Sequence, residues 1–475
     1  MNFIVIMNDT LRPDYLADNG TAECHTPNFS EFAKTAAVFD RCYLGSFPTI
    51  PNRTDLFTGR FGEPIHPWLP LSFDALTLPE ILRENGYVTQ LICDTPHLIN
   101  GGHGFDFPFH AWDFIRGNEV DRYGMDSDPV ELPFSDASKV NKAAVNKSLC
   151  QYVRNQRGRR HEEDWVTYRT FQGAANWLER NLGHEEFFLW IDGFDPHEPT
   201  EAPQHYVDLY DPGYAGDQYL SHIPDPGLLT EAEIRNVKAR YAASVTFVDR
   251  CVGMVFDTVD RLGLRDTTCV VCLSDHGTQL NEHGGILTKS CIHTEVATTV
   301  HMIRAPSCSQ PGARFDDRVQ PADLAPTLLD LAGIEIPDQM QGRSYLPLLK
   351  GEACDVRDVA ISANAPNARN ASATITARDR RWQLIDQPDP VQRVLHDLES
   401  DPGQTVDVSA DHPEVVERLH EDVVDFLKGH EAQPQVVRWF EEGNPGDLTD
   451  YLARRPGYES WYTYWNHILD SEVLS

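Results

Sequence analysis

Short apolar runs alternate with longer amphipathic segments along the first 350 residues, and this alternation limits the folds that the chain can adopt. Short apolar runs are typical of buried strands, whereas apolar residues at every third or fourth position indicate helices. The strands that we expect are 3–7, 87–93, 187–191, 269–273 and 297–303. Two helices are expected to begin at Pro27 and Thr77, and three more are expected to cover 164–182, 230–262 and 323–331. The pattern predicts an α/β fold with a large, mixed but mostly parallel sheet flanked by helices.

The pattern changes after about residue 350. Short alternating strands are expected at 357–362, 381–386 and 393–397, followed by a helix at 413–428. This predicts a small C-terminal α+β subdomain with an antiparallel sheet. A single hydrophobic core rarely grows beyond roughly 250–300 residues, and this chain has 475 residues. We therefore expect separate units. They are a catalytic α/β domain at 1–350, the subdomain at 351–435 and a tail rich in Trp and Tyr at 436–475.

The charge balance excludes some partners. The chain has 73 acidic and 40 basic residues and a net charge of −33, which argues against nucleic acid, because phosphate backbones are bound by Lys and Arg. The apolar run after Met1 is much shorter than the roughly 20 residues of a membrane helix, so no membrane partner is expected. This run has no basic segment before it, and the ten cysteines are scattered. Together these features favour a cytoplasmic protein with free thiols.

Acidic residues follow four of the predicted strands at the point where each strand ends. In open α/β sheets, ligands bind beyond the carboxyl ends of the strands. One Asp in such a place is usually a helix cap, but four strand ends favour a metal site. Carboxylate and imidazole groups suit Ca²⁺, Mn²⁺ or Zn²⁺. The residues concerned are Asn8-Asp9, Asp94-Thr95-Pro96-His97, Asp192 to His197, and Ser274-Asp275-His276.

The run from Phe47 to Arg60 reads FPTIPNRTDLFTGR. It resembles the signature of the sulfatase family within the alkaline-phosphatase superfamily, in which Cys or Ser stands where this chain has Thr49. The Asp275-His276 pair resembles the phosphonate monoester hydrolases and choline sulfatase more than it resembles many arylsulfatases. The other matching segments are 9–14, 194–199, 274–289, 325–333, 342–344 and 397–402.

The resemblance implies an alkaline-phosphatase-like sandwich and an ester hydrolase with one divalent metal ion, Mn, Ca or Zn. It implies metal ligation by Asp9, Thr49, Asp275 and His276. It gives catalytic roles to Thr49, Arg53, His197 and Lys289, and contacts with the transferred group to Thr95 and His97. The implied partner is a small anionic ester. The resemblance to phosphonate monoester hydrolases also implies a homo-oligomer.

Thr49 departs from the family pattern, because a threonine is not converted to the formylglycine that sulfatases use. Two other branches of the superfamily use a Thr nucleophile. We therefore expect Thr49 to attack phosphorus in a monoanionic phosphodiester or phosphonate monoester and to form a covalent phospho-enzyme. Arg53 and Lys289 would stabilise the non-bridging oxygens, and His197 would protonate the leaving alkoxide.

Three alternatives stay open at this stage. The same site could hydrolyse sulfate esters without formylglycine, since fold alone does not separate two tetrahedral anions. The chain could be a non-catalytic protein that binds a metal and an anion. It could also transfer the phosphoryl group to an alcohol in place of water.

Overall fold

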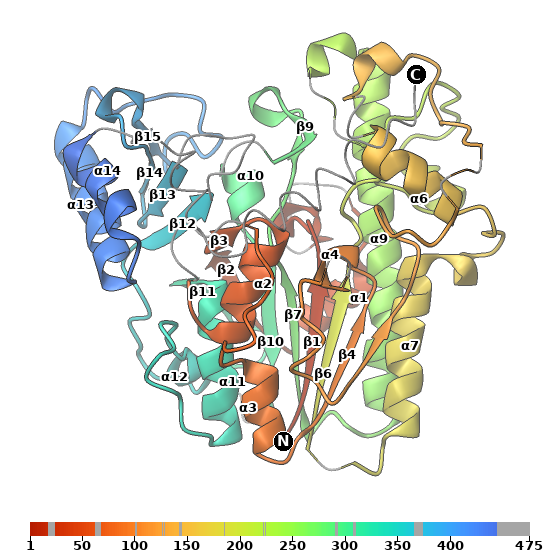
Figure 1. Cartoon of the computed structure of the whole chain (residues 1–475), viewed down its shortest axis with the longest axis horizontal. Coiled ribbons are helices and arrows are strands. Elements are labelled where there is room, and N and C mark those ends of the chain that lie inside the picture. Colours follow the sequence, from red (N-terminus) through yellow and green to blue (C-terminus); the bar gives the residue numbers. More distant parts are fainter. Residues whose placement is uncertain are drawn as a thin grey trace.

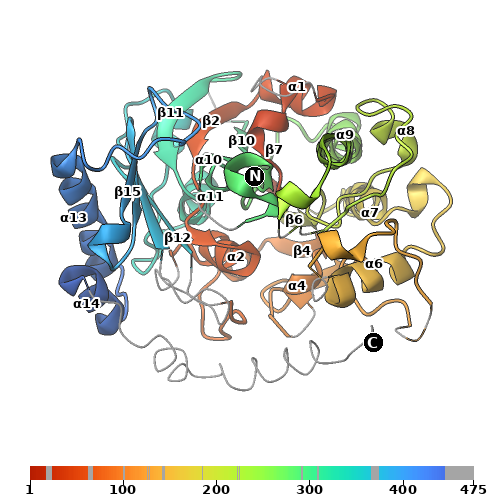
Figure 2. The same cartoon turned by 90° about the horizontal axis from the view of Figure 1, so that it is seen from above.

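The first strand, β1 (Asn2–Asn8), sets the layered architecture, because its side chains alternate between two cores. Phe3, Val5 and Met7 belong to one apolar cluster, and Ile4 and Ile6 belong to the other. Every residue of β1 is buried. A strand that is apolar on both sides lies inside a sheet with helices on both faces, as Figures 1 and 2 show.

The computed structural model describes residues 1–17, 24–61, 68–99, 102–125, 127, 129–141, 145–184, 186–221, 223, 225–289, 293–306, 310–364 and 374–443. The predicted tail therefore lies outside the described residues from 444 onward. Among the described residues, no helix is long and apolar enough to cross a membrane.

The large sheet has eight strands. Six of them run parallel to β1, and β10 runs antiparallel to both of its neighbours. This confirms the predicted mixed, mostly parallel sheet. The order across the sheet is β11 (Arg314–Val319), β2 (Ala37–Cys42), β10 (His301–Arg304), β7 (Thr268–Ser274), β1, β6 (Phe187–Gly193), β4 (Val88–Cys93) and β5 (Ala111–Phe114).

Helices cover the two faces of this sheet. One face packs against α1, α7 and α9, and the other packs against α2, α3, α11 and α12. Figure 2 shows α1, α7 and α9 on one side of the sheet and α2 and α11 on the other. Their bounds are α1 (Pro27–Ala33), α2 (Thr49–Thr58), α3 (Leu78–Glu84), α4 (Pro96–Ile99), α6 (Cys150–Asn155), α7 (Val166–Arg180), α8 (Gln204–Val207), α9 (Glu231–Arg261), α10 (Thr294–Ala297), α11 (Leu324–Ala332) and α12 (Leu346–Leu349). The long helix α9 begins at a capping box, in which Thr230 and Glu233 satisfy each other's backbone N–H groups.

The second sheet contains five strands and packs against two helices. Its order is β15 (Val394–Asp397), β14 (Trp382–Asp386), β13 (Thr374–Arg378), β12 (Ala360–Asn364) and β3 (Ser46–Phe47). The four C-terminal strands are antiparallel, as predicted, and β3 adds to them in parallel from the N-terminal part of the chain. Helices α13 (Pro413–Gly429) and α14 (Pro434–Glu442) cover this sheet.

Three local predictions differ from the structure. The strand predicted at 297–303 is shorter, because α10 ends at Ala297 and β10 begins only at His301. The strand predicted at 357–362 begins later, at Ala360. Helix α14 spans the predicted boundary at residue 435, since Val436, Trp439 and Phe440 pack in the subdomain core. The division of the chain into domains otherwise stays a prediction.

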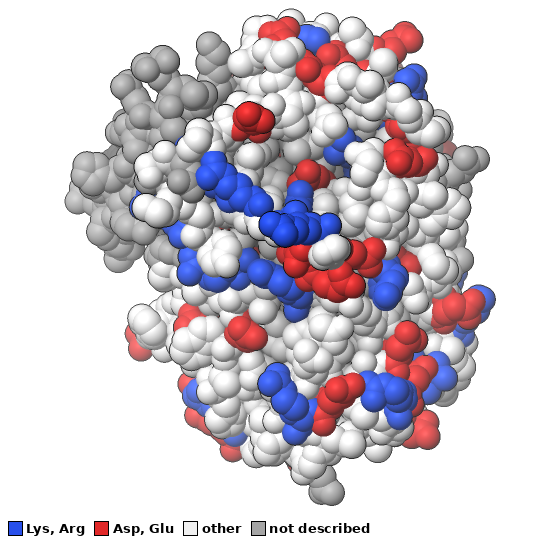
Figure 3. Space-filling model, turned by 90° about the vertical axis from the view of Figure 1, so that its right-hand side faces the viewer, with Lys and Arg blue, Asp and Glu red and all other residues white. Residues whose placement is uncertain are grey.

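Charged side chains of both signs share the surface despite the large net charge. On the face drawn in Figure 3, Lys and Arg lie among Asp and Glu. Arg261 of α9, for example, pairs with Glu179 of α7. Such exposed pairs contribute little to stability, about 0–1 kcal/mol each.

The buried imidazole of His301 predicts how stability depends on pH. Its Nε2 lies 2.7 Å from the Tyr345 hydroxyl, and burial lowers its pKa to about 4. Because the pKa of His301 is lower in the folded state than in the unfolded state, its contribution to the unfolding free energy is full above about pH 6.5 and is lost as the pH falls toward about 4. Between these pH values, the unfolding free energy of the wild type should fall by up to about 1.4 kcal/mol more per pH unit than that of His301→Gln. Urea unfolding at a series of pH values measures this, with the exposed His184→Gln as the control. Equal slopes in His301→Gln and wild type would contradict the assignment.

Candidate active site

Three aspartates lie side by side because three neighbouring strands end together. Asp9 directly follows β1, Asp275 directly follows β7, and Asp192 lies near the end of β6. Since β7, β1 and β6 are adjacent and parallel, their carboxyl ends meet at one edge of the sheet. All three side chains are fully buried. This is the edge at which the sequence predicted a site.

Arg53 of α2 lies between these carboxylates and is itself fully buried. Its Nη2 lies 2.9 Å from Asp192 Oδ1 and 3.2 Å from Asp9 Oδ2, and its Nη1 lies 2.5 Å from Asp275 Oδ2. Its Nε lies 3.1 Å from Asp192 Oδ2, so all three guanidinium nitrogens contact carboxylates. A contact between Arg53 and the substrate stays a prediction.

Asp9, Asp275 and His276 together fit a divalent metal ion. Their ligand atoms all lie within 4.8 Å of one another. Asp9 Oδ2 and His276 Nε2 are buried and have no hydrogen-bond partner among the described residues. The Nδ1–H of His276 donates to the Gly277 carbonyl, 2.9 Å away, so its Nε2 offers a lone pair.

The electrostatics of this group agree with a cation site. Burial raises the pKa of Asp9 well above its usual range, and the Asp275 carboxylate raises it further. Burial acts in the same direction on Asp275, but His276 and Arg53 outweigh it and hold the pKa of Asp275 below its usual range. Burial lowers the pKa of His276 to about 4, so its imidazole is neutral at pH 7. Two buried carboxylates and a neutral imidazole form a donor set that Mn²⁺, Ca²⁺ or Zn²⁺ can use.

Thr49 is the first residue of α2, and only 2% of its surface is exposed. The helix ends at Gly59, which adopts the left-handed conformation at φ 64° that glycine tolerates best. The N-terminus of a helix carries partial positive charge, which favours anions. Asn52 of the same helix donates to the backbone carbonyl of Asp275 at 3.0 Å, which ties α2 to the end of β7.

His197, Glu198 and Lys289 form a second group of interacting residues. Lys289 Nζ lies 2.7 Å from Glu198 Oε1 and 3.0 Å from His197 Nε2. His197 Nδ1 lies 2.6 Å from the Glu198 carbonyl, which can only accept a hydrogen bond. The ring therefore carries its proton on Nδ1, and its Nε2 accepts a hydrogen bond from the Lys289 ammonium. Burial lowers the pKa of His197 to about 3.

Thr95 and His97 were predicted to contact the transferred group, and that contact stays a prediction. The Thr95 hydroxyl donates to Asp192 Oδ1 at 2.6 Å. His97 Nε2 lies 2.9 Å from Glu119 Oε2, and its ring meets Trp68 edge-on. Both residues flank the site, since they follow β4, the neighbour of β6.

Sequence reasoning did not assign roles to Asp192, Glu198 or Glu119. Asp192 was visible at a strand end, but its ion pair with Arg53 depends on how α2 packs.

Two further strand-end residues, Asp94 and Asp195, hold the loop that carries His197. Asp94 accepts hydrogen bonds from the Phe194 N–H and the Thr170 hydroxyl. Burial raises the pKa of Asp94 to about 8 and that of Asp195 to about 7.

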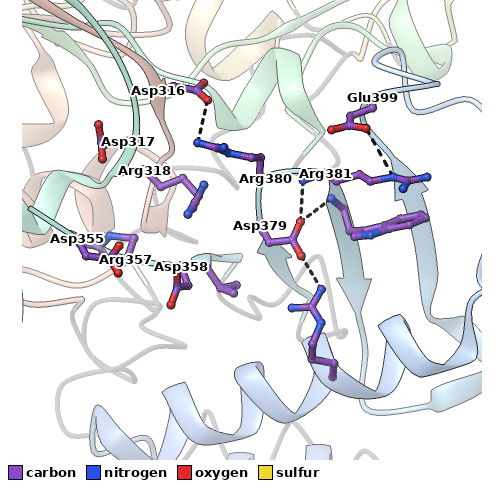
Figure 4. Close-up of a pocket in the computed structure, with 13 residues that line it drawn as sticks. Asp316, Asp317, Arg318, Asp355, Arg357, Asp358, Asp379, Arg380, Arg381 and Glu399 are labelled. Atoms are coloured by element: carbon purple, nitrogen blue, oxygen red, sulfur yellow. Dashed lines mark hydrogen bonds and ion pairs between the residues drawn. The ribbon is translucent and has the colours of Figure 1, made fainter.

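A hollow of about 660 Å³ lies elsewhere, between β11 and the C-terminal sheet (Figure 4). It is lined mainly by Arg and acidic residues, several of which pair with one another, such as Arg380 with Asp316 and Arg418 with Asp379. Its lining includes no His, Ser, Thr or Cys. None of the residues predicted from the sequence lines it, so we assign the chemistry to the strand-end site.

The buried ion-pair cluster predicts a large effect of replacing Arg53. Arg53→Met would leave three buried carboxylates without their cation, and breaking a buried pair costs roughly 3–5 kcal/mol. We expect a loss of that size in the unfolding free energy, measured by urea unfolding of the metal-free protein at pH 7. Arg60→Met is the control, because Arg60 just beyond α2 pairs with an exposed Glu431 at 3.5 Å. A loss no larger than that of the control would show that the cluster is not held by Arg53.

Two protein-family models match this chain. The family model described as Sulfatase matches residues 1–334, and the model described as N-sulphoglucosamine sulphohydrolase, C-terminal, matches 281–429. Arylsulfatase K of Xenopus laevis is 26% identical over 513 residues, which covers 98% of this chain and 90% of that protein. N-acetylglucosamine-6-O-sulfatase of Bacteroides thetaiotaomicron is 25% identical and covers 74% of this chain and 71% of that protein.

Solved structures share the fold. The phosphonate monoester hydrolase of Agrobacterium radiobacter superposes with a TM-score of 0.72 at 20% identity and covers 90% of this chain and 96% of that one. The phosphonate monoester hydrolase of Silicibacter pomeroyi gives 0.70 at 22% identity, with 90% and 95% covered. These superpositions confirm the predicted alkaline-phosphatase-like architecture.

Proposed function

Because this chain belongs to the sulfatase family and is an ester hydrolase, we propose that it cleaves a monoanionic phosphodiester or phosphonate monoester through Thr49. The observation that carries the proposal is the hydroxyl-bearing Thr49 at the signature position, buried at the N-terminus of α2. A threonine supports direct attack on phosphorus and not the formylglycine route.

The charge at the site supports a monoanionic centre. Lys289 is the cation that faces His197, and the buried carboxylate of Glu198, 2.7 Å away, balances its charge. The charge of Arg53 is balanced by Asp9, Asp192 and Asp275. A dianionic phosphate monoester would demand more uncompensated positive charge than these pairs leave.

Enzymes of this family are generally dependent on a divalent metal ion. Asp9, Asp275 and His276 would hold the ion, with Thr49 as a further ligand. When bound, a Mn²⁺, Ca²⁺ or Zn²⁺ ion supplies a Lewis acid that makes the Thr49 hydroxyl more acidic.

The first step forms a bond between Thr49 Oγ and phosphorus and breaks the bond between phosphorus and the leaving oxygen. The leaving oxygen takes its proton from the hydrogen-bonded pair of Lys289 and His197. In the structure this proton resides on Lys289, since the Nε2 of His197 accepts. In this step the Thr49 hydroxyl releases its proton to solvent, and Lys289 takes one proton back from solvent. Water then breaks the bond between Thr49 Oγ and phosphorus: its hydroxyl joins phosphorus to give the product acid, and its other proton restores the Thr49 hydroxyl.

A lysine ammonium has three N–H groups. Two of those of Lys289 are directed to Glu198 and His197, which leaves the third for a non-bridging oxygen of the substrate. Lys289 thus both binds the anion and supplies the proton. This refines the sequence-based prediction, in which His197 was the proton donor.

A panel of three aryl esters tests the proposal. Bis-p-nitrophenyl phosphate, phenyl p-nitrophenyl phosphonate and p-nitrophenyl sulfate are offered to metal-reconstituted wild type and to Thr49→Ala. We expect turnover of the first two that disappears in Thr49→Ala. Turnover of the sulfate alone would overturn the proposal in favour of a sulfatase that works without formylglycine.

The sulfatase alternative has a specific observation in its favour, because the curated relatives bear the names of sulfatases. The non-catalytic alternative predicts metal binding without turnover of any ester. A phosphotransferase would show itself as transfer to added glycerol in place of water. A homo-oligomer and a cytoplasmic location stay predictions; eight free cysteines among the described residues support a reducing compartment.

A further inference from the structure

A second group of metal-ligand side chains lies outside the strand-end site, where a short hairpin meets α10. The hairpin consists of β8 (Gln279–Leu280) and β9 (Ile286–Thr288), and His283 lies in the turn between them. His293 precedes α10, and Glu295 lies in its first turn. Figure 1 shows β9 and α10 at the same end of the molecule.

The three side chains converge closely. The rings of His283 and His293 are stacked, with centroids 3.8 Å apart and an interplanar angle of 10°. His283 Nε2 lies 3.0 Å from Glu295 Oε1. One ligand atom from each residue lies within 4.8 Å of the others.

The contact between His283 and Glu295 does not have the geometry of a hydrogen bond. Glu295 Oε1 is buried, and although His283 Nε2 lies 3.0 Å from it, that oxygen has no hydrogen-bond partner among the described residues. Two ligand atoms about 3.0 Å apart are what adjacent positions around one ion require when each bond is about 2.0–2.2 Å long. The separation therefore fits two ligands of a shared cation.

The ligand types define the ion. Two imidazoles and one carboxylate are a donor set for Zn²⁺ and similar first-row transition metals, while Ca²⁺ and Mg²⁺ prefer oxygen ligands alone. The neighbouring Glu282 is engaged elsewhere, because it pairs with Arg12 at 3.1 Å.

We propose that His283, His293 and Glu295 bind a divalent transition-metal ion of the Zn²⁺ type, separate from the ion at Asp9, Asp275 and His276. The bound ion joins the turn of the hairpin to the start of α10. Lys289 lies between these two anchors in the sequence.

Zinc binding by a variant with a disabled strand-end site tests this proposal. In the Asp9→Asn background, elemental analysis after gel filtration should find one Zn²⁺ per chain. Adding His283→Gln, His293→Gln or Glu295→Gln should abolish this binding. His205→Gln is the matched control, because His205 is exposed and pairs with Glu162 at 3.6 Å without a second imidazole; it should retain the ion. No zinc in the background protein, or equal zinc in the His283→Gln and background proteins, would overturn the proposal.

A second measurement avoids any substitution at the site, in case those variants fold poorly. Histidines of the Asp9→Asn protein are labelled with diethyl pyrocarbonate, with and without Zn²⁺, and the labelled peptides are quantified by mass spectrometry. We expect Zn²⁺ to protect His283 and His293 but not His205. Equal labelling of His283 in both conditions would contradict the site. Neither measurement depends on which ester the protein hydrolyses.

Discussion

Replacing Thr49 by alanine is expected to lower kcat/KM on phosphodiesters and phosphonate monoesters by roughly 10⁴-fold or more, which is the scale seen when a nucleophile is removed. The reason is that Thr49 carries the hydroxyl at the start of α2, where Arg53 donates to the Thr49 carbonyl at 3.3 Å and Asn52 ties the helix to Asp275. Residual activity would come only from binding and orientation of the ester. Initial rates on the two phosphorus esters at several concentrations give the change.

The control for this variant lies one turn along the same helix. The Thr54 hydroxyl donates to the Ile50 carbonyl within α2 at 3.0 Å, so Thr54→Ala removes a hydroxyl without touching the site. We expect it to keep activity within about twofold, since a surface-side change of this kind usually costs less than about 0.5 kcal/mol. If Thr49→Ala kept most of its activity, Thr49 would not be the nucleophile.

The second large effect is expected for Lys289→Met. Removing an acid that protonates the leaving group typically costs about 10²–10⁴-fold. Since p-nitrophenolate leaves readily without a proton, the loss should be greatest for esters with alkyl leaving groups. Measurements of kcat/KM over a series of leaving groups with rising basicity would show a steeper dependence in Lys289→Met than in wild type.

Two further variants separate Lys289 from its neighbours. Lys238→Met is the control, because Lys238 is an exposed lysine on α9, and it should behave as wild type. His197→Asn should show a smaller change of slope than Lys289→Met, because His197 accepts a hydrogen bond from Lys289 and carries no positive charge above its pKa of about 3. A steeper slope in His197→Asn would return the role of acid to His197, as the sequence alone suggested.

The sequence predicted the strand-end cluster because its signal is local. Asp9, Asp275 and His276 each follow a strongly apolar strand, and parallel strands bring their carboxyl ends together. The alternation of the strands likewise predicted the large sheet, since a strand that is buried on both faces is apolar throughout. These features depend on neighbouring residues in the chain.

Other features could not be predicted, because they depend on contacts between distant residues. The ion pairs of Arg53 with Asp192 and Asp275 join residues 139 and 222 positions apart. The addition of β3 to the C-terminal sheet pairs Ser46 with Ala363, and no periodicity in either segment signals it. The position of α10 was missed for a different reason, since the run from residue 297 reads as a strand, but Ala297 is the last residue of a helical turn.

The most direct test of the central claim is to look for the covalent intermediate on Thr49. The metal-reconstituted protein is mixed with phenyl p-nitrophenyl phosphonate and quenched in acid during turnover, and the peptide that contains Thr49 is analysed by mass spectrometry. We expect a phenylphosphonyl adduct on the Thr49 side chain that is absent from Thr49→Ala. Continued turnover of the ester with an unmodified Thr49, or with the adduct on another residue, would contradict the account.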